Sequence, residues 1–430
     1  MKKLFAMLLV IALTLVSFAG CAKPVEAAPA AEAPAATEAP AAAEAPAAAE
    51  APAAEPTKLT LILRGGTYGD VIKAALPAFE AENNVTCEVL DLSFADLHDK
   101  IALDAPNAAG AYDLCMVDGS WMAEFAENGV LENLTGMGYA YDEDIIPATT
   151  AAGVRDGNTY LIPYFGNVNI FLYNKALLGE NPLPESWEEV LNIATEITAS
   201  GKPGYLLRAQ AGDNIVSDFL SVLLANGGWV LGEDNQTVTV NTPEFKAALE
   251  LYIKLLEQGK ILDKDDIVAA IDGGEAGMGL GWPGWYVPAV DGPASYTVVP
   301  TKLTKDSAPV STSIYGVWFV GMCANSQNKE LTLKLLEYIS SPEVQLASVE
   351  LGGVPCRKSC LMNADVLAAK PHLETVYNAL QVGVYRPLIK QWNDFTLALG
   401  AELDNAVQGV KTVDQALADA QAACELVMMG

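Results

Sequence analysis

The chain has 430 residues, 54 of them acidic and 25 basic, and its formal net charge is −29. A surface of this sign repels nucleic acid and anionic lipid headgroups, so a nucleic-acid-binding role is excluded. The length suits two lobes rather than one hydrophobic core, and with only two histidines, far apart in the sequence, a zinc site is not expected.

The first twenty residues have the layout of a secretory signal peptide. Lys2 and Lys3 precede an apolar run over residues 4–18, which is shorter than a typical membrane-spanning helix. The segment ends in Phe-Ala-Gly before Cys21, and this ending resembles the signal of bacterial lipoproteins, whose cysteine is lipidated and becomes the new N-terminus. The resemblance predicts an extracytoplasmic protein that Cys21 anchors to the outer face of the cell membrane. A signal peptide cleaved next to a chance cysteine is the alternative.

Residues 21–56 have the composition of a disordered tether. Alanine dominates the segment, proline recurs every six residues from Pro34 to Pro52, and no large apolar side chain follows Val25. Such a segment cannot bury enough apolar surface to offset the entropy lost on ordering its backbone. We therefore expect residues 21–56 to link the lipid anchor to a folded body.

Strands and helices alternate at the start of this body. The expected order is strand 59–66, helix 70–82, strand 86–92, helix 94–105, strand 112–118 and a helix that ends near Asn128-Gly129. Alternation of this kind predicts an α/β layer with a mainly parallel sheet.

Helix-start signals are frequent in the middle of the chain. Ser186 and Glu189 form a capping-box pattern, and Thr242 followed by Pro243 is typical of a first helical turn. The remaining expected strands are 296–300 and 315–323. The remaining expected helices are one over 329–339, one that starts at Ser341-Pro342, and a final helix capped by Thr412.

Six phrases of the body resemble those of a known protein family. They are YLIPYFGNVNIFLYNKALL (160–178), LPESWEEVL (183–191), NTPEFKAALELYIKLLEQG (241–259), GEAGM (274–278), SPEVQLASVELGGVPCRKS (341–359) and TVDQALADAQ (412–421). Their order and wording are similar to the extracellular solute-binding proteins of ABC transporters, family 1, which include maltose- and other sugar-binding proteins.

The resemblance implies a type II periplasmic-binding-protein-like fold. In this fold two α/β lobes, joined by hinge strands, close over a ligand that lies in the cleft between them. By analogy, lobe 1 comprises 57–165 plus 296–345, and lobe 2 comprises 166–295 plus 346–430. The resemblance also implies a monomer without a cofactor, which captures a small-molecule solute and delivers it to the permease subunits of an importer.

Sugar binding needs aromatic rings for the C–H face of a pyranose and charged or amide side chains for its hydroxyl groups. Loops that combine these residue types, especially at the C-terminal ends of strands, are expected to line the cleft. The candidate ligand-binding residues are Arg64 and Tyr68, Asp118 and Trp121, Tyr164 and Asn167, Trp282 and Trp285, and Arg386 and Trp392. The family carries an acidic ligand-binding residue in the loop of Asp118, which favours this side chain, and a helix N-cap is its alternative role.

The segment GEAGMGLGWPGWYVP (274–288) holds three large aromatic side chains among glycines and prolines. The resemblance implies a cleft-facing tryptophan shortly after Met278. We expect at least one of Trp282 and Trp285 to stack on the ligand, with Trp285 preferred, and Tyr286 to pack within the loop.

The sequence lacks a GxSxG elbow, an HExxH helix and a P-loop, so the predicted function is binding and not catalysis. We expect a sugar- or oligosaccharide-binding protein of an ABC importer. The alternatives are the same fold with a polyamine, a phosphorylated compound or an iron complex, a surface glycosidase, and a sensor that reports its ligand to a signalling partner. The spacing of Cys356 and Cys360 leaves open whether these two residues form a disulfide.

Overall fold

The computed structural model describes residues 55–430. The expected signal peptide, Cys21 and the tether up to Ala54 lie outside the described residues. Two five-stranded sheets organise the described part of the chain, and a pair of short strands, β4 (Val154–Arg155) and β5 (Asn158–Thr159), stands apart from them. None of the helices in residues 55–430 is both long and apolar enough to cross a membrane.

The first sheet has the strand order β2-β1-β3-β12-β6. Its strands are β1 (Thr57–Arg64), β2 (Val85–Leu92), β3 (Leu114–Asp118), β6 (Leu161–Phe165) and β12 (Trp318–Met322). β1 pairs in parallel with β2 and β3, whereas β12 runs antiparallel to both of its neighbours. The strand–helix alternation expected at the start of the body is therefore confirmed, and β12 is the one strand of this sheet with the opposite direction.

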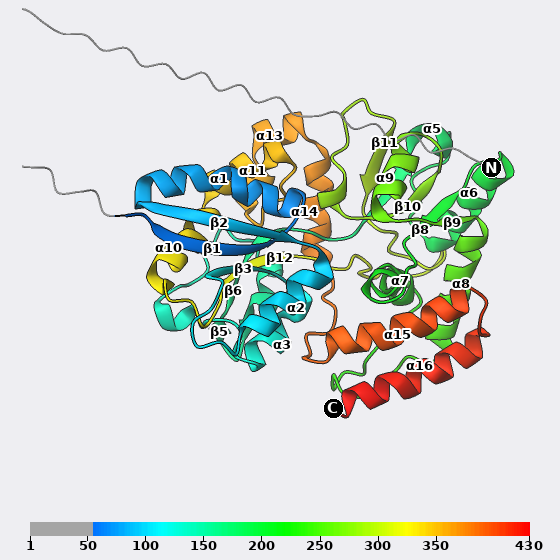
Figure 1. The fold of residues 1–430 in the computed structure, drawn as a ribbon. Helices are drawn as coiled ribbons and strands as arrows, with labels where there is room; N and C mark the ends of the chain where they lie inside the picture. The colour runs from blue at the N-terminus through cyan, green and yellow to red at the C-terminus, as the bar shows by residue number, and fades with distance from the viewer. Residues whose placement is uncertain (1–54) are drawn as a thin grey trace, which may run out of the picture. The chain divides into compact units, whose positions relative to one another are not determined.

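Helices pack on both faces of the first sheet, with α1 and α2 on opposite sides of β1 (Figure 1). They are α1 (Thr67–Asn83), α2 (Phe94–Asp104), α3 (Met122–Glu127), α10 (Lys329–Ile339) and α11 (Pro342–Ser348). Local capping explains two of the starts: the Ser93 hydroxyl accepts from the N–H of Asp96 in α2, and the Ser341 hydroxyl accepts from the N–H of Val344 in α11.

The second sheet has the strand order β11-β7-β10-β8-β9. Its strands are β7 (Ile170–Asn174), β8 (Tyr205–Leu207), β9 (Gly259–Ile261), β10 (Met278–Gly281) and β11 (Ala294–Thr297). β7 runs antiparallel to β10 and β11, and β8 runs parallel to β9 and β10. The two sheets and their helices form the two lobes that the resemblance predicts.

The second lobe contains both helices whose start the sequence indicates and helices that the sequence does not predict. They are α5 (Lys175–Leu178), α6 (Trp187–Ala199), α7 (Asp213–Ala225), α8 (Pro243–Glu257), α9 (Lys264–Asp272), α15 (Trp392–Val407) and α16 (Val413–Met428). Ser186 and Glu189 form the expected capping box of α6, and the hydroxyls of Thr242 and Thr412 cap α8 and α16. The apolar stripe of α8, including Phe245, is buried in the core of this lobe.

Three chain segments cross between the lobes side by side. They connect β6 to β7 (166–169), β11 to β12 (298–317) and α14 (His372–Val382) to α15 (383–391). Single bridges pair Val168 with Tyr315 and Ile314 with Val384, and the N–H of Tyr315 donates to the carbonyl of Val384 at 2.9 Å. Main-chain hydrogen bonds therefore hold the hinge together.

These crossings bear on where one lobe ends and the other begins. The expected boundary at 295/296 falls within β11, which pairs with the second sheet along its whole length, and the boundary at 345/346 falls within α11. We propose that the division follows the crossings instead, with 57–165 and 318–382 in the first lobe and 170–297 and 392–430 in the second.

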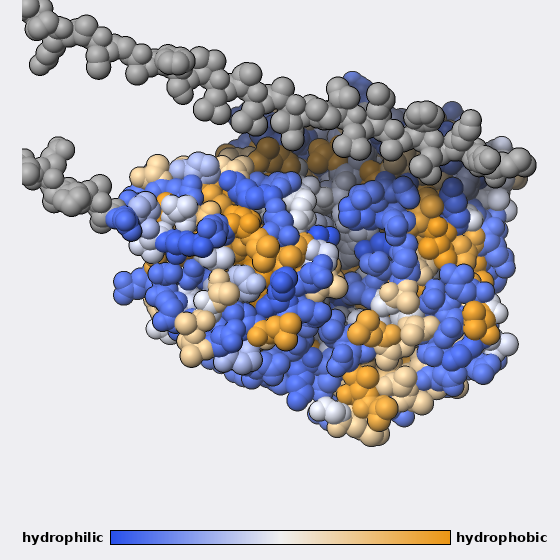
Figure 2. Space-filling view, in the orientation of Figure 1, coloured by the Kyte–Doolittle hydropathy of each residue, from blue (hydrophilic) through white to orange (hydrophobic). Residues whose placement is uncertain are grey.

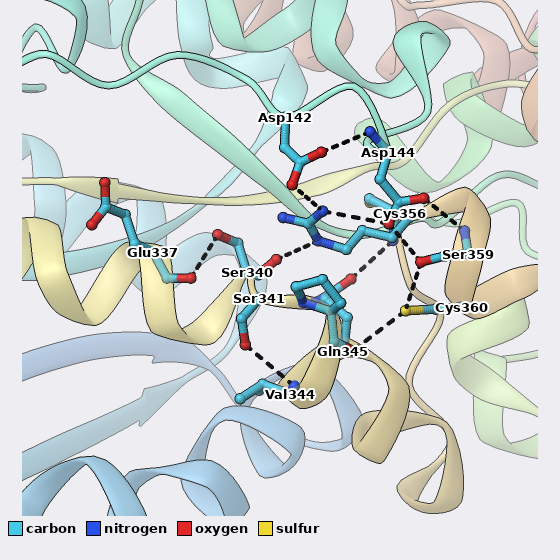
Figure 3. A network of polar contacts seen from close by, with 12 residues as sticks. Asp142, Asp144, Glu337, Ser340, Ser341, Val344, Gln345, Cys356, Ser359 and Cys360 are labelled. Atoms are coloured by element: carbon cyan, nitrogen blue, oxygen red, sulfur yellow. Dashed lines mark hydrogen bonds and ion pairs between the residues drawn. The ribbon is translucent and has the colours of Figure 1, made fainter. Parts of the chain in front are cut away.

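A buried arginine, Arg357, fixes the chain after α11 to the first lobe. Figure 3 shows its polar surroundings, among them Asp142, Asp144 and Ser340. The Nη1 of Arg357 lies 2.9 Å from a carboxylate oxygen of Asp142, and its Nε donates to the carbonyl of Ser340 at 2.6 Å. Cys356 and Cys360 on either side of it are buried free thiols, so the structure has no disulfide at this pair. Short helices α4 (Pro147–Thr150), α12 (Lys358–Leu361) and α13 (Ala364–Ala369) complete this region.

Candidate ligand-binding site

A cavity of about 1120 Å³ lies between the two lobes. The first lobe contributes the C-terminal ends of β1 and β3 and the beginnings of α1 and α2, and the second contributes the segments after β8 and β10 and the first turns of α15. The surface is hollowed between the lobes in Figure 2. Strand ends and helix starts meet here, as they do at ligand sites of open α/β sheets.

The structure brings most of the sequence-predicted residues to this cavity. Those that line it are Arg64, Tyr68, Asp118, Asn167, Trp282, Trp285 and Arg386. They come from both lobes and from the hinge, so the fold gathers side chains that are far apart in the sequence.

Arg386 is buried and bridges the two lobes. Its Nη2 donates to Oδ1 of Asp118 at 2.6 Å, and its Nη1 donates to Oδ1 of Asp213 at 3.0 Å. Asp118 ends β3 in the first lobe, whereas Asp213 begins α7 in the second. Burial alone would lower the pKa of Arg386, but Asp118 and Asp213 outweigh burial and raise this pKa. The guanidinium is therefore charged and held by one carboxylate from each lobe.

Asp118 caps the turn that follows β3 and also lines the cavity. Its Oδ1 accepts from the backbone N–H of Ser120 at 2.9 Å and from the Ser120 hydroxyl at 2.6 Å, which caps the short turn after β3. The same oxygen accepts from Arg386 and lines the cavity. Capping thus positions the carboxylate rather than removing it from the site.

Tyr68 connects the start of α1 to the hinge and to the second lobe. Its hydroxyl lies 3.4 Å from Nδ2 of Asn167, whose Oδ1 lies 3.4 Å from the N–H of Gly284. Burial raises the pKa of Tyr68 to about 12, against the opposing effects of Arg64 and Arg208, so the phenol keeps its proton at neutral pH. A Cβ at Gly284 would lie 2.9 Å from the Tyr68 hydroxyl, which shows how closely the lobes approach here.

The two tryptophans of the glycine-rich segment occupy different environments. Trp282 follows β10 and is nearly buried, whereas Trp285, in the turn Pro283–Trp285, is half-buried. The guanidinium carbon of Arg208 lies 4.9 Å from the ring centre of Trp285, which is the geometry of a cation–π contact. Tyr286 donates its hydroxyl proton to Asp272 at 2.6 Å and so fixes the loop.

Three expected residues do not line the cavity: Trp121, Tyr164 and Trp392 are all buried in the lobes. Trp121 packs edge-on against Trp318 with ring centroids 5.7 Å apart, and Trp392 stacks on Phe395 at 5.6 Å. Each lies near a strand or helix end, but its side chain faces the core. Proximity to the cavity along the sequence does not determine which way a side chain points.

The structure adds lining residues that sequence reasoning missed, among them Phe94, Arg208 and Asp213. Arg208 pairs with the buried carboxylate of Asp218 at 2.9 Å, and its Nε has no partner within residues 55–430. One sequence pattern could have pointed to Arg208 and Asp213: Arg208 directly follows a strand, and Asp213 begins a helix directly after Gly212. The strand, β8, has only three residues and does not stand out in the sequence.

The cavity is suited to polar and aromatic recognition. The carboxylates of Asp118 and Asp213 are both engaged by Arg386, and the aromatic rings come from both lobes. No group of three or more histidine, cysteine, aspartate or glutamate side chains in the described residues is arranged to hold a metal ion.

Comparisons with known proteins identify similar proteins over most of the chain. The family described as bacterial extracellular solute-binding protein matches residues 74–375. A probable amino-acid ABC transporter periplasmic-binding protein of Sinorhizobium fredii is 23% identical over 366 residues, which make up 81% of this chain and 84% of that protein.

Solved structures share the fold. Maltose-bound MalE3 of T. maritima has a TM-score of 0.76 and 22% identity, over 86% of this chain and 99% of that one. A solute-binding protein of Thermotoga lettingae bound with α-D-tagatose has a TM-score of 0.77 and 23% identity, over 86% of this chain and 100% of that one. These likenesses confirm the two-lobed α/β fold. With the family match over residues 74–375, they establish that the chain belongs to the bacterial extracellular solute-binding proteins, which bind solutes for ABC transporters outside the cytoplasm.

Proposed function

We propose that the protein captures a sugar or an oligosaccharide and delivers it to the permease of an ABC importer. The observation that carries this proposal is the lining of the interlobe cavity, which combines aromatic rings with charged side chains. Tyr68 and Trp318 come from the first lobe, and Trp282 and Trp285 from the second. Flat rings cover the C–H face of a pyranose, and ionised side chains form the stronger hydrogen bonds to its hydroxyl groups.

The size of the cavity supports a ligand larger than one sugar ring. Its volume of about 1120 Å³ lies slightly above the range of roughly 300–1,000 Å³ that is usual for small-molecule pockets. Two proteins of the same fold are described with bound maltose and bound α-D-tagatose, which supports a saccharide as the ligand class.

Ligand capture would act through the equilibrium between open and closed lobes. A solute that contacts both walls binds the closed form more tightly and shifts the equilibrium toward it. The permease would then recognise the closed form. This role involves binding alone, so a panel of glycans should be recovered intact after incubation with the protein, and release of reducing ends would instead indicate a glycosidase.

A thermal-shift screen over mono- and oligosaccharides tests the proposed ligand class. Ligands that bind the folded state raise the melting temperature by mass action. Amino acids and polyamines belong in the same screen, because one similar protein is described as an amino-acid transporter component. Stabilisation by a saccharide, followed by calorimetric titration, is the expected result. If only an amino acid or a polyamine raises the melting temperature, the sugar assignment is wrong.

We further propose that lipidated Cys21 holds the protein at the outer face of the cell membrane. The Phe-Ala-Gly-Cys ending of the signal and the tether that follows support this proposal. Cells fed a clickable palmitate analogue should label the wild-type protein, and Cys21→Ala should abolish the label and release the protein from the membrane fraction. Equal labelling of both proteins would contradict the assignment.

A further inference from the structure

Arg64 differs from the other arginines of the described residues because it pairs with no carboxylate. The other four each have an acidic partner: Arg155 with Glu127, Arg208 with Asp218, Arg357 with Asp142, and Arg386 with Asp118. In a chain with a net charge of −29, a guanidinium without an acidic partner is unexpected. Arg64 also lines the interlobe cavity, so its free charge lies within the candidate site.

The hydrogen bonds of Arg64 leave one edge of its guanidinium unused. Nη1 donates to the carbonyl of Leu92 at 3.1 Å and to that of Gly65 at 3.5 Å, and these two bonds fix the side chain to the first sheet. Nε and Nη2 form no hydrogen bond within residues 55–430. Adjacent N–H groups of a guanidinium match the two oxygens of a carboxylate in a bidentate pair.

A helix start beside Arg64 provides a second, independent feature of an anion site. α1 begins after Gly66, which has φ 81° and no side chain to cap the helix. The first N–H groups of a helix lack intrahelical partners and carry the positive end of its dipole. Asp70 in the first turn is exposed and pairs with Lys73 at 2.8 Å.

Three other uncapped helices begin at the cavity, α7, α9 and α15. α7 and α9 differ from α1 because an acidic side chain of their first turn, Asp213 in α7 and Asp265 in α9, lines the cavity. α7 carries Asp213 in its first turn, and this carboxylate lines the cavity and binds Arg386. At α1, Gly65, Gly66 and Thr67 line the cavity and contribute no acidic side chain. Burial lowers the pKa of Arg64, and no carboxylate counteracts this effect. An anionic group of the ligand would supply the missing partner.

We propose that Arg64 and the start of α1 bind a carboxylate of the ligand, and that the ligand is therefore an acidic sugar such as a uronic acid or a uronic-acid oligosaccharide. This inference rests on the proposed sugar-binding function. The aromatic side chains would bind the sugar rings, while the unused edge of Arg64 and the N–H groups at the start of α1 would bind the carboxylate. A guanidinium edge pairs with a carboxylate or a phosphate in the same way, but the single positive charge of Arg64 matches the single negative charge of a carboxylate.

Calorimetric titration with matched pairs of ligands tests the inference. D-galacturonate is compared with D-galactose, D-glucuronate with D-glucose, and trigalacturonate with a neutral trisaccharide. A charge-assisted bidentate contact predicts that the acidic member binds tighter by roughly 10- to 100-fold. Galactose 1-phosphate is the third arm, and tighter binding of this ester than of any uronate would overturn the carboxylate assignment.

Two variants locate the effect. Arg64→Gln should reduce the ratio of the two dissociation constants within each pair toward one. Thr67→Asp places a carboxylate in the first turn of α1, where it favours the helix but repels a second carboxylate, and should reduce the same ratio in a folded protein. Arg155→Gln, at a surface ion pair of the first lobe, should leave the ratio as in the wild type.

The outcomes separate the two proposals. If the neutral sugar binds as tightly as its acidic partner, or if Arg64→Gln and Thr67→Asp both keep the acidic preference, the anion site is wrong and the sugar-binding function stands. If no saccharide of either kind binds, the sugar-binding function is wrong and the acidic-sugar inference fails with it.

Discussion

The guanidinium of Arg386 lies 2.6 Å from the carboxylate of Asp118, and the two side chains are only 4% and 5% exposed. This ion pair joins the segment that crosses between the lobes for the third time to the end of a central strand of the first sheet. Removing one member of such a pair leaves a buried charge without a partner. This change lowers the free energy of unfolding by far more than the intact pair raises it.

Arg386→Leu should therefore lower the free energy of unfolding by about 3–5 kcal/mol, because Asp118 and Asp213 both lose their cation. Urea denaturation measures this difference. Arg155→Leu is the matched control: it removes a partly exposed arginine from its pair with Glu127 and should cost about 1 kcal/mol or less. Equal losses in the two variants would contradict the special role of Arg386.

Trp285→Ala should weaken saccharide binding by roughly tenfold, since one aromatic face of the cavity is lost. Trp285 is the less buried of the two tryptophans in its loop, so binding should also change the tryptophan fluorescence of the wild-type protein and change it less in this variant. Tyr286→Phe keeps the ring but removes the hydrogen bond to Asp272, and is the control for loop disturbance. Wild-type affinity in both Trp282→Ala and Trp285→Ala would rule out ring stacking by this loop.

How far the sequence predicts the structure depends on whether the signal is local. Helix starts with a capping side chain were predicted, because that side chain lies within three residues of the N–H it binds, as at Ser186, Thr242 and Thr412. The uncapped α1 was expected from Asp70 but begins at Thr67. The two-lobed arrangement came from the family resemblance and not from composition or periodicity.

Residues at the ends of recognisable strands were predicted at the cavity and line it, as Arg64 at the end of β1 and Asp118 at the end of β3 do. In α15 the sequence suggested Trp392, but the helical period places Trp392 and Phe395 in the core and turns Asn393, Thr396 and Leu397 toward the cavity. The rotation of a helix about its own axis is set by packing against distant segments, which a local pattern does not contain.

The two histidines of the chain, His98 and His372, should make stability depend on pH in opposite directions. Burial lowers the pKa of His98, but its contacts with Glu124 and Asp99 outweigh burial and raise this pKa above the usual 6.5. The resulting stabilisation is present below pH 6.5 and is lost as the pH rises through the pKa of the folded state. Burial, with a smaller effect of Lys370, lowers the pKa of His372 to about 4, so stability is lost as the pH falls from 6.5 toward 4.

Urea denaturation between pH 4.5 and pH 8 measures these effects. His372→Gln should lose less stability than the wild type below pH 6.5, because glutamine has no proton to bind in the unfolded chain. His98→Gln should lose less than the wild type above pH 6.5. Differences from the wild type that stay constant over the whole range would contradict both assignments.

The melting temperature should not depend on a reducing agent, because all six cysteines in residues 55–430 are free. Cys360 donates to the carbonyl of Pro342 at 3.4 Å instead of bonding to Cys356. Thermal denaturation with and without a phosphine reductant checks this, and thiol titration of the denatured protein counts the free groups. A lower melting temperature in the reductant would indicate a disulfide between Cys356 and Cys360.

The contact between Tyr68 and Gly284 sets a limit on how far the lobes can close. Because position 284 has no side chain, the loop with the two tryptophans reaches the phenol ring directly, and any larger residue there would act as a spacer. A series of side chains of increasing size at position 284 would then keep the lobes progressively further apart. Ligands that bind only when the lobes close fully would lose affinity first. The size of the residue at position 284 would therefore set the smallest solute that can contact both walls of the cavity.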